Sequence, residues 1–174
     1  SCLHHDSSSN KQLTRIPNTI LVIKLSAMGD ALCVMPAIRQ LSTSLQGSTI
    51  TWLTTKRTNP QLFSALPFIS KTLVLPTGFI NLIFFLLRLY RIIGKFDLVI
   101  DYDQYYRTSE LFAYLGKFSA GFLTPHKGRG FNLSVEYDPS ENEKILFQML
   151  TSKVLLSLGT HLPNQEPLLP EILH

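Results

Sequence analysis

The sequence predicts an α/β domain with a Rossmann-like parallel sheet and flanking helices. Short, continuously apolar and β-branched runs alternate with longer segments of helical character. This strand–helix–strand order is typical of right-handed βαβ units, whose strands are buried on both faces. The chain has 174 residues, of which 45% are hydrophobic and 16% charged, which suffices for one domain with a buried core.

The first predicted strand, Thr19–Lys24, is the apolar run TILVIK. A tight loop, Leu25–Asp30, follows it and leads into an amphipathic helix from about Asp30 to Leu45. Gly47 then ends this helix, as glycine commonly does just past a helix end. The next expected elements are the strand Ser48–Thr54, the helix Asn59–Leu66, the strand Lys71–Leu75 and the helix Phe79–Ile93.

The alternation continues in the second half of the chain. Asp97–Tyr102 (DLVIDY) is the fourth predicted strand, and Thr108–Leu115 continues as helix. Ala120–Leu123 is a fifth, short strand, and a final helix over Ser140–Leu158 is ended by Gly159. The repeated order places helices on both faces of the predicted sheet.

Composition divides the chain into three parts. Residues 1–18 are polar and lack the apolar core of a signal peptide, so we interpret them as a disordered leader. Residues 19–160 form the predicted domain. Residues 161–174 contain prolines at a density that suits an interdomain linker stub, and we expect the domain that would follow it to be missing.

Charge and cysteine content narrow the possible partners. The net charge of +4 is compatible with anionic substrates or an anionic lipid surface. It is too small to indicate nucleic acid, and no run of Lys and Arg supports such binding. Cys2 and Cys33 provide no disulfide framework, which indicates a reducing cytoplasm. No His or Cys cluster has the spacing of a metal site, and no cofactor is predicted.

The loop Ser26-Ala27-Met28-Gly29-Asp30 lies where ligands collect in open α/β sheets, at the carboxyl end of a strand. Gly29 allows a ligand to approach the backbone closely, or allows a positive φ. Asp30 falls at the helix start, where backbone N–H groups stabilise an anion, and an ionised carboxylate there can act as a general base. The alternative is that Asp30 is only an N-cap. A single glycine does not make the G-x-G-x-x-G dinucleotide fingerprint, and no P-loop is present.

Segments in order along the chain carry a family resemblance: Ile20–Asp30, Met35–Ala37, Phe96–Asp101 and Gly128–Phe131. They resemble the glycosyltransferase family 9 enzymes, typified by the ADP-heptose:lipopolysaccharide heptosyltransferases. The family opens with an apolar strand, a Met/Leu-Gly-Asp loop and a helix bearing Pro-Ala. The resemblance covers roughly Thr19 to Gly159.

The resemblance implies the N-terminal, acceptor-side half of a two-domain GT-B enzyme. In the family's pattern Asp30 corresponds to the general base of an inverting, metal-independent transfer of heptose, with Ser26, Met28 and Gly29 beside it at the substrate. The donor, ADP-heptose, would bind through the missing C-terminal domain, and the acceptor would be a lipopolysaccharide inner core of the Kdo-lipid A type. We expect the chain alone to be inactive. The expected location is the cytoplasm, including the inner face of the inner membrane.

Basic side chains provide further candidates for substrate binding. Arg107 follows the fourth predicted strand, and Lys127 and Arg129 lie in a Gly-rich loop after the fifth. All three could face the cleft at the strand ends and bind carboxylates or phosphates of the acceptor. The alternative is that they are ordinary solvated surface charges. Asp101 is interpreted as the end of its strand rather than as an acid–base partner of Asp103.

Phe79–Ile93 (FINLIFFLLRLYRII) is the most apolar stretch of the chain. It is interrupted by Asn81, Arg88 and Arg91, and it falls short of the ~20 residues needed to span a bilayer. It is either a buried crossover helix, which we favour, or an interfacial helix whose aromatic and arginine side chains touch the membrane. Apolar residues cover nearly all of its faces, so we expect some exposed hydrophobic surface.

Other functions stay open at this point. The chain could be a non-catalytic α/β binding module, or the remnant of a decayed glycosyltransferase, that presents one face to a partner. A nucleotide-binding domain of the oxidoreductase kind is disfavoured, because the glycine fingerprint is missing.

Overall fold

The computed structural model describes residues 15–93, 95–114 and 116–159. The predicted linker 161–174 lies outside these residues, as does most of the predicted leader 1–18. At the start of the described chain, the Asn18 backbone N–H donates to the Asp97 carboxylate over 3.0 Å, so this end of the leader contacts the domain. Both domain boundaries stay predictions.

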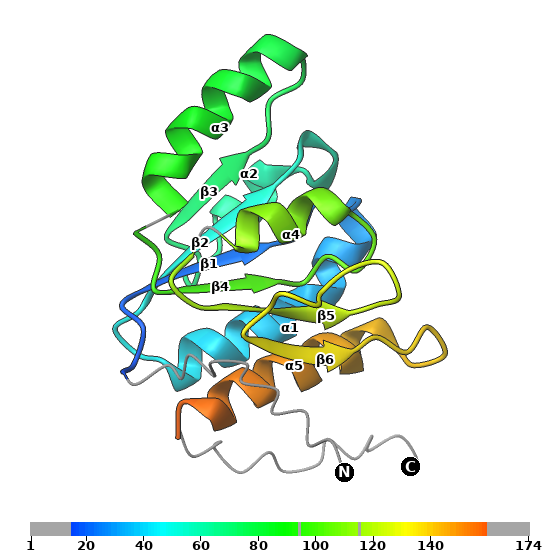
Figure 1. Ribbon diagram of the computed structural model, residues 1–174. Helices are drawn as coiled ribbons and strands as arrows, with labels where there is room; N and C mark the ends of the chain where they lie inside the picture. The colour runs from blue at the N-terminus through cyan, green and yellow to red at the C-terminus, as the bar shows by residue number, and fades with distance from the viewer. Residues whose placement is uncertain (1–14, 94, 115, 160–174) are drawn as a thin grey trace, which may run out of the picture.

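The sheet has six strands: β1 (Thr19–Ile23), β2 (Thr49–Thr54), β3 (Lys71–Val74), β4 (Leu98–Asp101), β5 (Ser119–Leu123) and β6 (Leu133–Glu136). All of them run parallel, in the order β3-β2-β1-β4-β5-β6 (Figure 1). Ile20 in the centre lies beside both Ile50 of β2 and Leu98 of β4. The predicted Rossmann-like parallel sheet is thereby confirmed.

The helices are α1 (Met28–Ser44), α2 (Pro60–Ser64), α3 (Phe79–Ile93), α4 (Arg107–Ala113) and α5 (Glu143–Ser157), with a short 3-10 helix, η1, at Lys56–Thr58. α1 and α5 pack against each other on one face of the sheet, and α3 and α4 lie on the other face (Figure 1). Within the described residues, no helix combines the length and the hydrophobicity that crossing a membrane requires.

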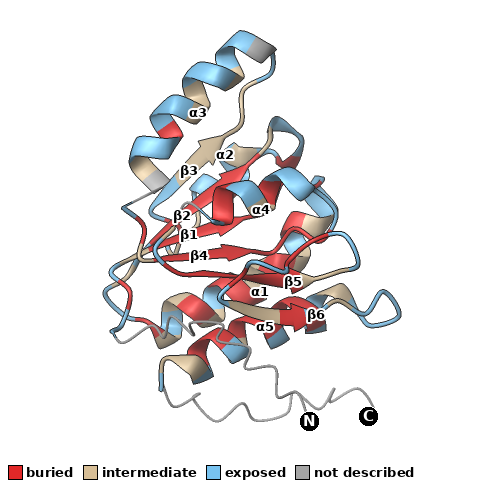
Figure 2. Cartoon of the chain, viewed as in Figure 1, coloured by how far each residue is buried: buried red, intermediate tan, exposed pale blue. Residues whose placement is uncertain are grey.

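Strand side chains alternate between two hydrophobic clusters, one on each face of the sheet. Ile20 and Val22 of β1 belong to the cluster with α1 and α5, whereas Leu21 and Ile23 belong to the cluster with α3 and α4. All four side chains are fully buried, and Figure 2 shows the central strands as buried along their length. Burial on both faces explains why these strands read as continuous apolar runs.

Two differences from the sequence prediction concern the edge of the sheet and the candidate site. β6 was not predicted, because it is a four-residue edge strand, and the alternation of apolar and polar residues in LSVE is too short to stand out. α1 begins at Met28 rather than at Asp30, which puts Asp30 inside the first helical turn. Pro36 lies within α1 without ending it.

The strand order reverses between β1 and β4. From β1 the chain adds β2 and β3 on one side, and β4, β5 and β6 follow on the other side. Folds of this type bind ligands at such a switch point, outside the carboxyl ends of the strands. Here the switch point is bordered by the loop 24–27, between β1 and α1, and the loop 102–106, between β4 and α4.

Candidate functional site

Asp103, just after β4, holds the two loops of the switch point together. Its Oδ2 accepts hydrogen bonds from the Leu25 backbone N–H at 3.1 Å and from the Ser26 hydroxyl at 3.2 Å. Its Oδ1 accepts from the backbone N–H groups of Tyr105 and Tyr106 at 3.0 and 2.8 Å. One buried carboxylate therefore fixes both loops, and the hydroxyl of Ser26, predicted to bind substrate, is directed to this carboxylate.

Lys127 is buried, contrary to the expectation that it faces the cleft: its side chain is 1% exposed. Its ammonium pairs with Asp101 Oδ2 at 2.6 Å and donates to the Ser109 hydroxyl at 2.5 Å and to the Tyr106 carbonyl at 3.2 Å. The reason is that a carboxylate buried at the end of β4 requires a counter-ion. Burial raises the pKa of Asp101 to about 6, although the Lys127 ammonium and the Ser109 hydroxyl act to lower it.

Asp101 and Asp103 are in contact, since the Asp103 backbone N–H donates to Asp101 Oδ1 at 3.0 Å and Lys127 also donates to the Asp103 carbonyl, but their carboxylates have different main partners. The first carboxylate pairs with Lys127, and the second accepts hydrogen bonds from the two loops. In the described part of the chain, no group of three or more His, Cys, Asp or Glu residues could hold a metal ion. The two aspartates therefore have separate structural roles.

Lys24 is a buried charged residue of the candidate site that the sequence analysis did not identify. It follows β1 directly, and its side chain is fully buried. Its ammonium donates to Gln104 Oε1 at 2.6 Å, and the Gln104 amide donates in turn to Glu143 at 2.7 Å. Burial lowers the pKa of Lys24, while nearby carboxylates, that of Asp103 foremost, act to raise it. A lysine at the end of an otherwise apolar run was the signal that could have identified it.

Asp30 is half-buried in the first turn of α1, at the carboxyl edge of the sheet. Ala27 occupies the N-cap position, so Asp30 is not the cap. Its carboxylate accepts no hydrogen bond from the residues that the structure describes, and its charge favours the charged form of the buried Lys24. This carboxylate is therefore available to a ligand.

Met28 and Gly29 form the exposed start of α1 beside Asp30. A Cβ atom added to Gly29 would meet nothing within 4 Å, and Gly29 is not among the residues with positive φ. Neither the packing nor the backbone of the chain itself requires glycine here. The sequence analysis gave two reasons for glycine at this position, a positive φ and the close approach of a ligand. Because φ is not positive, the close approach of a ligand is the reason that stays.

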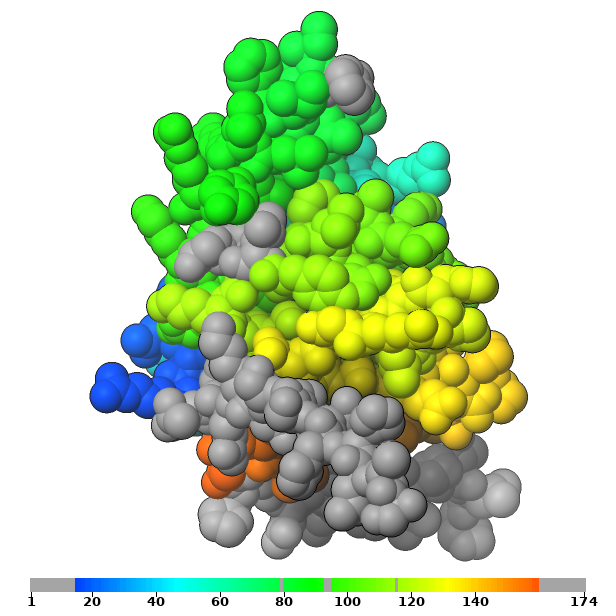
Figure 3. All heavy atoms as spheres, viewed as in Figure 1, coloured from blue at the N-terminus to red at the C-terminus, as the bar shows by residue number. Residues whose placement is uncertain are grey.

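Arg107 and Arg129 line one pocket, together with Lys127. The pocket has a volume of about 300 Å³, and its other lining residues are Glu110, Pro125, His126 and Gly128. Both arginines are exposed, and neither forms an ion pair with a residue in the described ranges. In the space-filling view, the α4 segment and the loop after β5 adjoin at the surface (Figure 3). The structure thus brings the three predicted basic residues together, two as exposed guanidinium groups and one as a buried ammonium.

Gly128 shapes the wall of this pocket. Its φ is +100°, and a Cβ atom there would lie 2.3 Å from the Phe122 carbonyl oxygen. Its backbone N–H donates to Glu110 Oε1 at 3.0 Å, which ties the loop to α4. Only glycine fits this backbone without strain, so the Gly-rich composition of the loop has a local steric reason.

Several solved glycosyltransferase structures resemble the chain over most of its length. The glycosyltransferase family 9 protein from Veillonella parvula DSM 2008 is 22% identical with a TM-score of 0.67, over 88% of this chain. The E. coli heptosyltransferase WaaC with ADP is 19% identical with a TM-score of 0.62, over 84% of this chain. The E. coli ADP-heptose lipopolysaccharide heptosyltransferase II is 17% identical with a TM-score of 0.59, over 76%. The chain shares its fold with these glycosyltransferases.

The chain spans about half the length of these glycosyltransferases or less, since the matches cover 44%, 49% and 40% of them. No protein-family model and no curated protein matches the sequence. The likeness therefore shows the fold alone, over about half or less of each matched structure.

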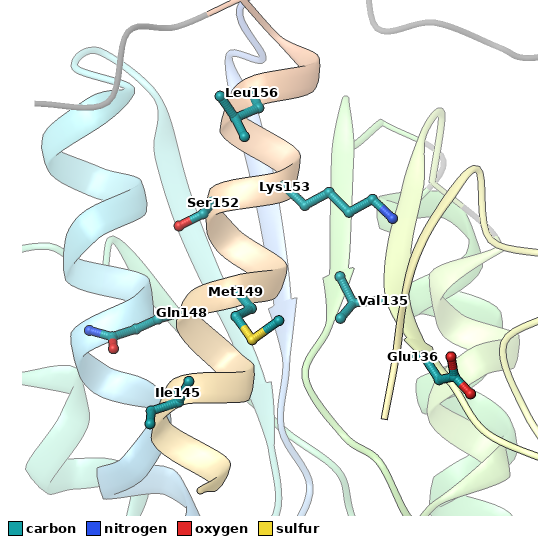
Figure 4. A pocket seen from close by; sticks show the side chains of 8 residues that line it. All are labelled: Val135, Glu136, Ile145, Gln148, Met149, Ser152, Lys153 and Leu156. Carbon is teal, nitrogen blue, oxygen red and sulfur yellow. The ribbon is translucent and has the colours of Figure 1, made fainter. Parts of the chain in front are cut away.

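A separate cavity lies between α5 and β6, away from the switch point (Figure 4). Its volume is about 610 Å³, and Ile145, Met149 and Leu156 of α5 contribute exposed apolar side chains to it. Glu136 and Lys153 add one charge of each sign. The cavity contains none of the predicted site residues and is a groove beside the edge strand.

Proposed function

We propose that this chain forms the amino-terminal, acceptor-side half of a GT-B glycosyltransferase that transfers heptose from ADP-heptose to the lipopolysaccharide inner core. Its fold likeness to heptosyltransferase II and to WaaC, which was solved with ADP, supports this reaction class. The observation that carries the proposal is the position of Asp30. A half-buried carboxylate without a hydrogen-bond partner among the described residues lies in the first turn of α1, on the same sheet edge as two exposed arginines.

Asp30 acts as the general base in the proposed reaction. Its carboxylate accepts the proton of the acceptor hydroxyl as that oxygen attacks the anomeric carbon of the heptose. The bond from this carbon to the diphosphate breaks with its electron pair, and ADP leaves on the side opposite to the attack. The anomeric configuration is therefore inverted. The scheme uses no metal ion and no cofactor.

The other predicted site residues have distinct proposed roles. Met28 and Gly29 border the bound substrate, since both are exposed at the start of α1. Arg107 and Arg129 bind carboxylates or phosphates of the acceptor, because guanidinium groups pair with such anions in a bidentate manner. Lys127 supports the pocket from beneath rather than contacting the acceptor, since its ammonium is committed to a buried ion pair.

In this proposal the donor site belongs to a second domain. The matched glycosyltransferases are about twice as long as this chain or longer. The acceptor, of the Kdo-lipid A type, is anchored in lipid, so the enzyme works from the cytoplasm at the inner face of the inner membrane. The chain alone is expected to bind acceptor without transferring sugar.

The test of the base is turnover in a two-domain protein that contains this chain. Asp30→Asn should lower kcat by about 10²- to 10⁴-fold with little change in the KM for the acceptor. Glu136→Gln, an exposed carboxylate at the end of the edge strand, is the matched control and should retain activity. Retained activity in Asp30→Asn would remove Asp30 from the reaction.

Acceptor binding by the chain alone tests the rest of the proposal. A soluble, phosphorylated Kdo oligosaccharide should bind in a titration, more weakly to Arg107→Ala and Arg129→Ala and unchanged in Glu136→Gln. Incubation of the chain with ADP-heptose and this acceptor should give no product, and measurable turnover would contradict the two-domain scheme. Absence of binding to the acceptor would favour the alternative of a non-catalytic module.

A further inference from the structure

The helix α3 is attached to the domain by one of its faces. Leu89 is buried, and Phe85, Leu86 and Ile92 pack with it against the cluster that contains Leu21 of β1. The favoured prediction of a buried crossover helix is therefore wrong for most of α3, because Leu89 is the one buried side chain among its described residues. Side chains of the opposite face are mostly exposed, and Figure 2 shows most of α3 in the colour of exposed residues.

The outer face of α3 carries a stripe of large apolar side chains. Ile80 and Phe84 are each 69% exposed, Leu87 is 61% exposed and Tyr90 is 66% exposed. Their spacing of three or four residues places them one above another along the helix. Scattered single apolar residues are normal on a protein surface, but a contiguous stripe of this kind marks an interaction site.

Cations are concentrated at the carboxyl-terminal end of the same face. Arg88, Arg91 and Lys95 are exposed and line, with Leu87 and Ile92, a shallow pocket of about 410 Å³. The segment 76–96 contains no Asp or Glu. None of the three cations forms an ion pair within the described ranges of the chain. The stripe and the pocket together therefore offer apolar area beside uncompensated positive charge.

We propose that the outer face of α3 docks onto an anionic lipid surface. Ile80, Phe84 and Leu87 enter the boundary between headgroups and acyl chains, while Arg88 and Arg91 bind lipid phosphates. An in-plane helix with an apolar face and basic side chains binds membranes in this way. The helix is 15 residues long, which is about 22 Å and shorter than the ~30 Å hydrocarbon core, so it lies on the membrane and does not cross it.

Charge complementarity favours lipid over a second copy of the chain. In a symmetric contact between two α3 helices, the arginines of each copy would meet a helix without acidic residues. The groove between α5 and β6 lacks this bias, because Glu136 accompanies Lys153 there. Of these two exposed apolar surfaces, the one on α3 is the one that matches an anionic membrane.

The test is flotation of the whole chain with vesicles of phosphatidylethanolamine and phosphatidylglycerol in a 3:1 ratio, roughly the charge of an anionic leaflet. The chain should float with these vesicles, less so at raised salt, and scarcely with phosphatidylcholine. Phe84→Ser/Leu87→Ser should reduce the partition coefficient at least about 10-fold. Arg88→Gln/Arg91→Gln should reduce it about 30-fold, since each cation near the surface contributes about 1 kcal/mol.

Met149→Ser/Leu156→Ser on α5 is the matched control, because these side chains are 49% and 63% exposed and lie outside α3. It should bind vesicles like the unmodified chain, and circular dichroism should show that every variant is folded. Equal binding by the α3 variants and the control overturns the proposal. A dimer in solution that the α3 variants abolish, without vesicle binding, also overturns it and assigns the face to a second copy. Neither donor nor acceptor is present, so the result is independent of the role of Asp30.

Discussion

The carboxyl edge of the sheet carries two sets of charged side chains with opposite surroundings. The inner set is buried and bonded within the chain: Lys24, Asp101, Asp103 and Lys127. The outer set is exposed or half-buried and forms no ion pair within the described residues: Asp30, Arg107 and Arg129. A buried charge must be paired or hydrogen-bonded, so the inner set is committed to holding loops. Only the outer set is free for ligands.

Lys127→Met should have the largest effect on stability and lower the free energy of unfolding by about 3–5 kcal/mol. The substitution leaves the Asp101 carboxylate buried without its counter-ion, which lies at 2.6 Å in the unmodified chain. Lys117→Met is the matched control: its pair with Asp97 spans 2.8 Å, but the Lys117 side chain is 62% exposed. We expect that control to lose at most about 1 kcal/mol in urea denaturation. Equal losses would erase the distinction between the two sets.

The loss of unfolding free energy in Lys127→Met should become smaller as the pH falls from about 7.5 to about 5. Burial raises the pKa of Asp101 from 3.8 to about 6, so this group favours folding below its unfolded pKa and loses that contribution as the pH rises through about 6. Without Lys127 the pKa rises further, because the ammonium acts to lower it. Acidification then neutralises the unpaired carboxylate. Urea unfolding curves at both pH values measure the loss of unfolding free energy. A loss that grows on acidification would contradict this prediction.

Asp103→Asn should cost about 2–4 kcal/mol of unfolding free energy. The amide nitrogen cannot accept the hydrogen bonds that one carboxylate oxygen accepts now, which leaves buried donors of one loop without a partner. Asp138→Asn is the control, since the Asp138 carboxylate is exposed and, among the residues that the structure describes, accepts hydrogen bonds only from Ser140. Thermal unfolding compares the two, and a loss in Asp138→Asn as large as in Asp103→Asn would argue against the role of Asp103 as a loop clamp.

Gly128→Ala should cost about 1–3 kcal/mol, because its left-handed backbone and the close Phe122 carbonyl leave no room for a Cβ atom. Gly29→Ala should be neutral or slightly stabilising, since open space surrounds that position within α1. The same Gly29→Ala chain should nevertheless bind acceptor more weakly if a ligand approaches there. Unchanged acceptor affinity would remove Gly29 from the proposed site.

Arg107→Ala and Arg129→Ala should have the smallest effect on stability, within about 0.5 kcal/mol of the unmodified chain. Both guanidinium groups are exposed and form no ion pair in the described ranges. Their loss should appear in acceptor affinity instead, measured by titration. A large destabilisation with unchanged acceptor affinity would show that these arginines stabilise the fold, like the inner set, and do not bind the acceptor.

From the sequence we could predict which loops border the candidate site, but not the buried hydrogen bonds inside it. Ser26, Met28, Gly29 and Asp30 could be placed at a strand end from local pattern, because a turn after a buried strand is a short-range feature. Arg107, Lys127 and Arg129 lie beside one pocket, since loops at the ends of parallel strands converge, but Lys127 is buried and the binding role of these residues stays a prediction. Lys24, Asp103 and Gln104 were missed as a network, because their partners lie far away in the sequence.

By itself, the sequence determined the parallel sheet and the order of most of its elements, since burial on both faces demands continuous apolar runs. Only the tertiary structure decided which charged side chains are buried and which are exposed. Lys127 and Arg129 are two positions apart in one loop, yet one is buried against Asp101 and the other is exposed. Likewise the composition of α3 could not say which of its apolar faces is covered. In both cases the burial of a side chain depends on which segment, distant in the sequence, packs against it. The local sequence does not determine that contact.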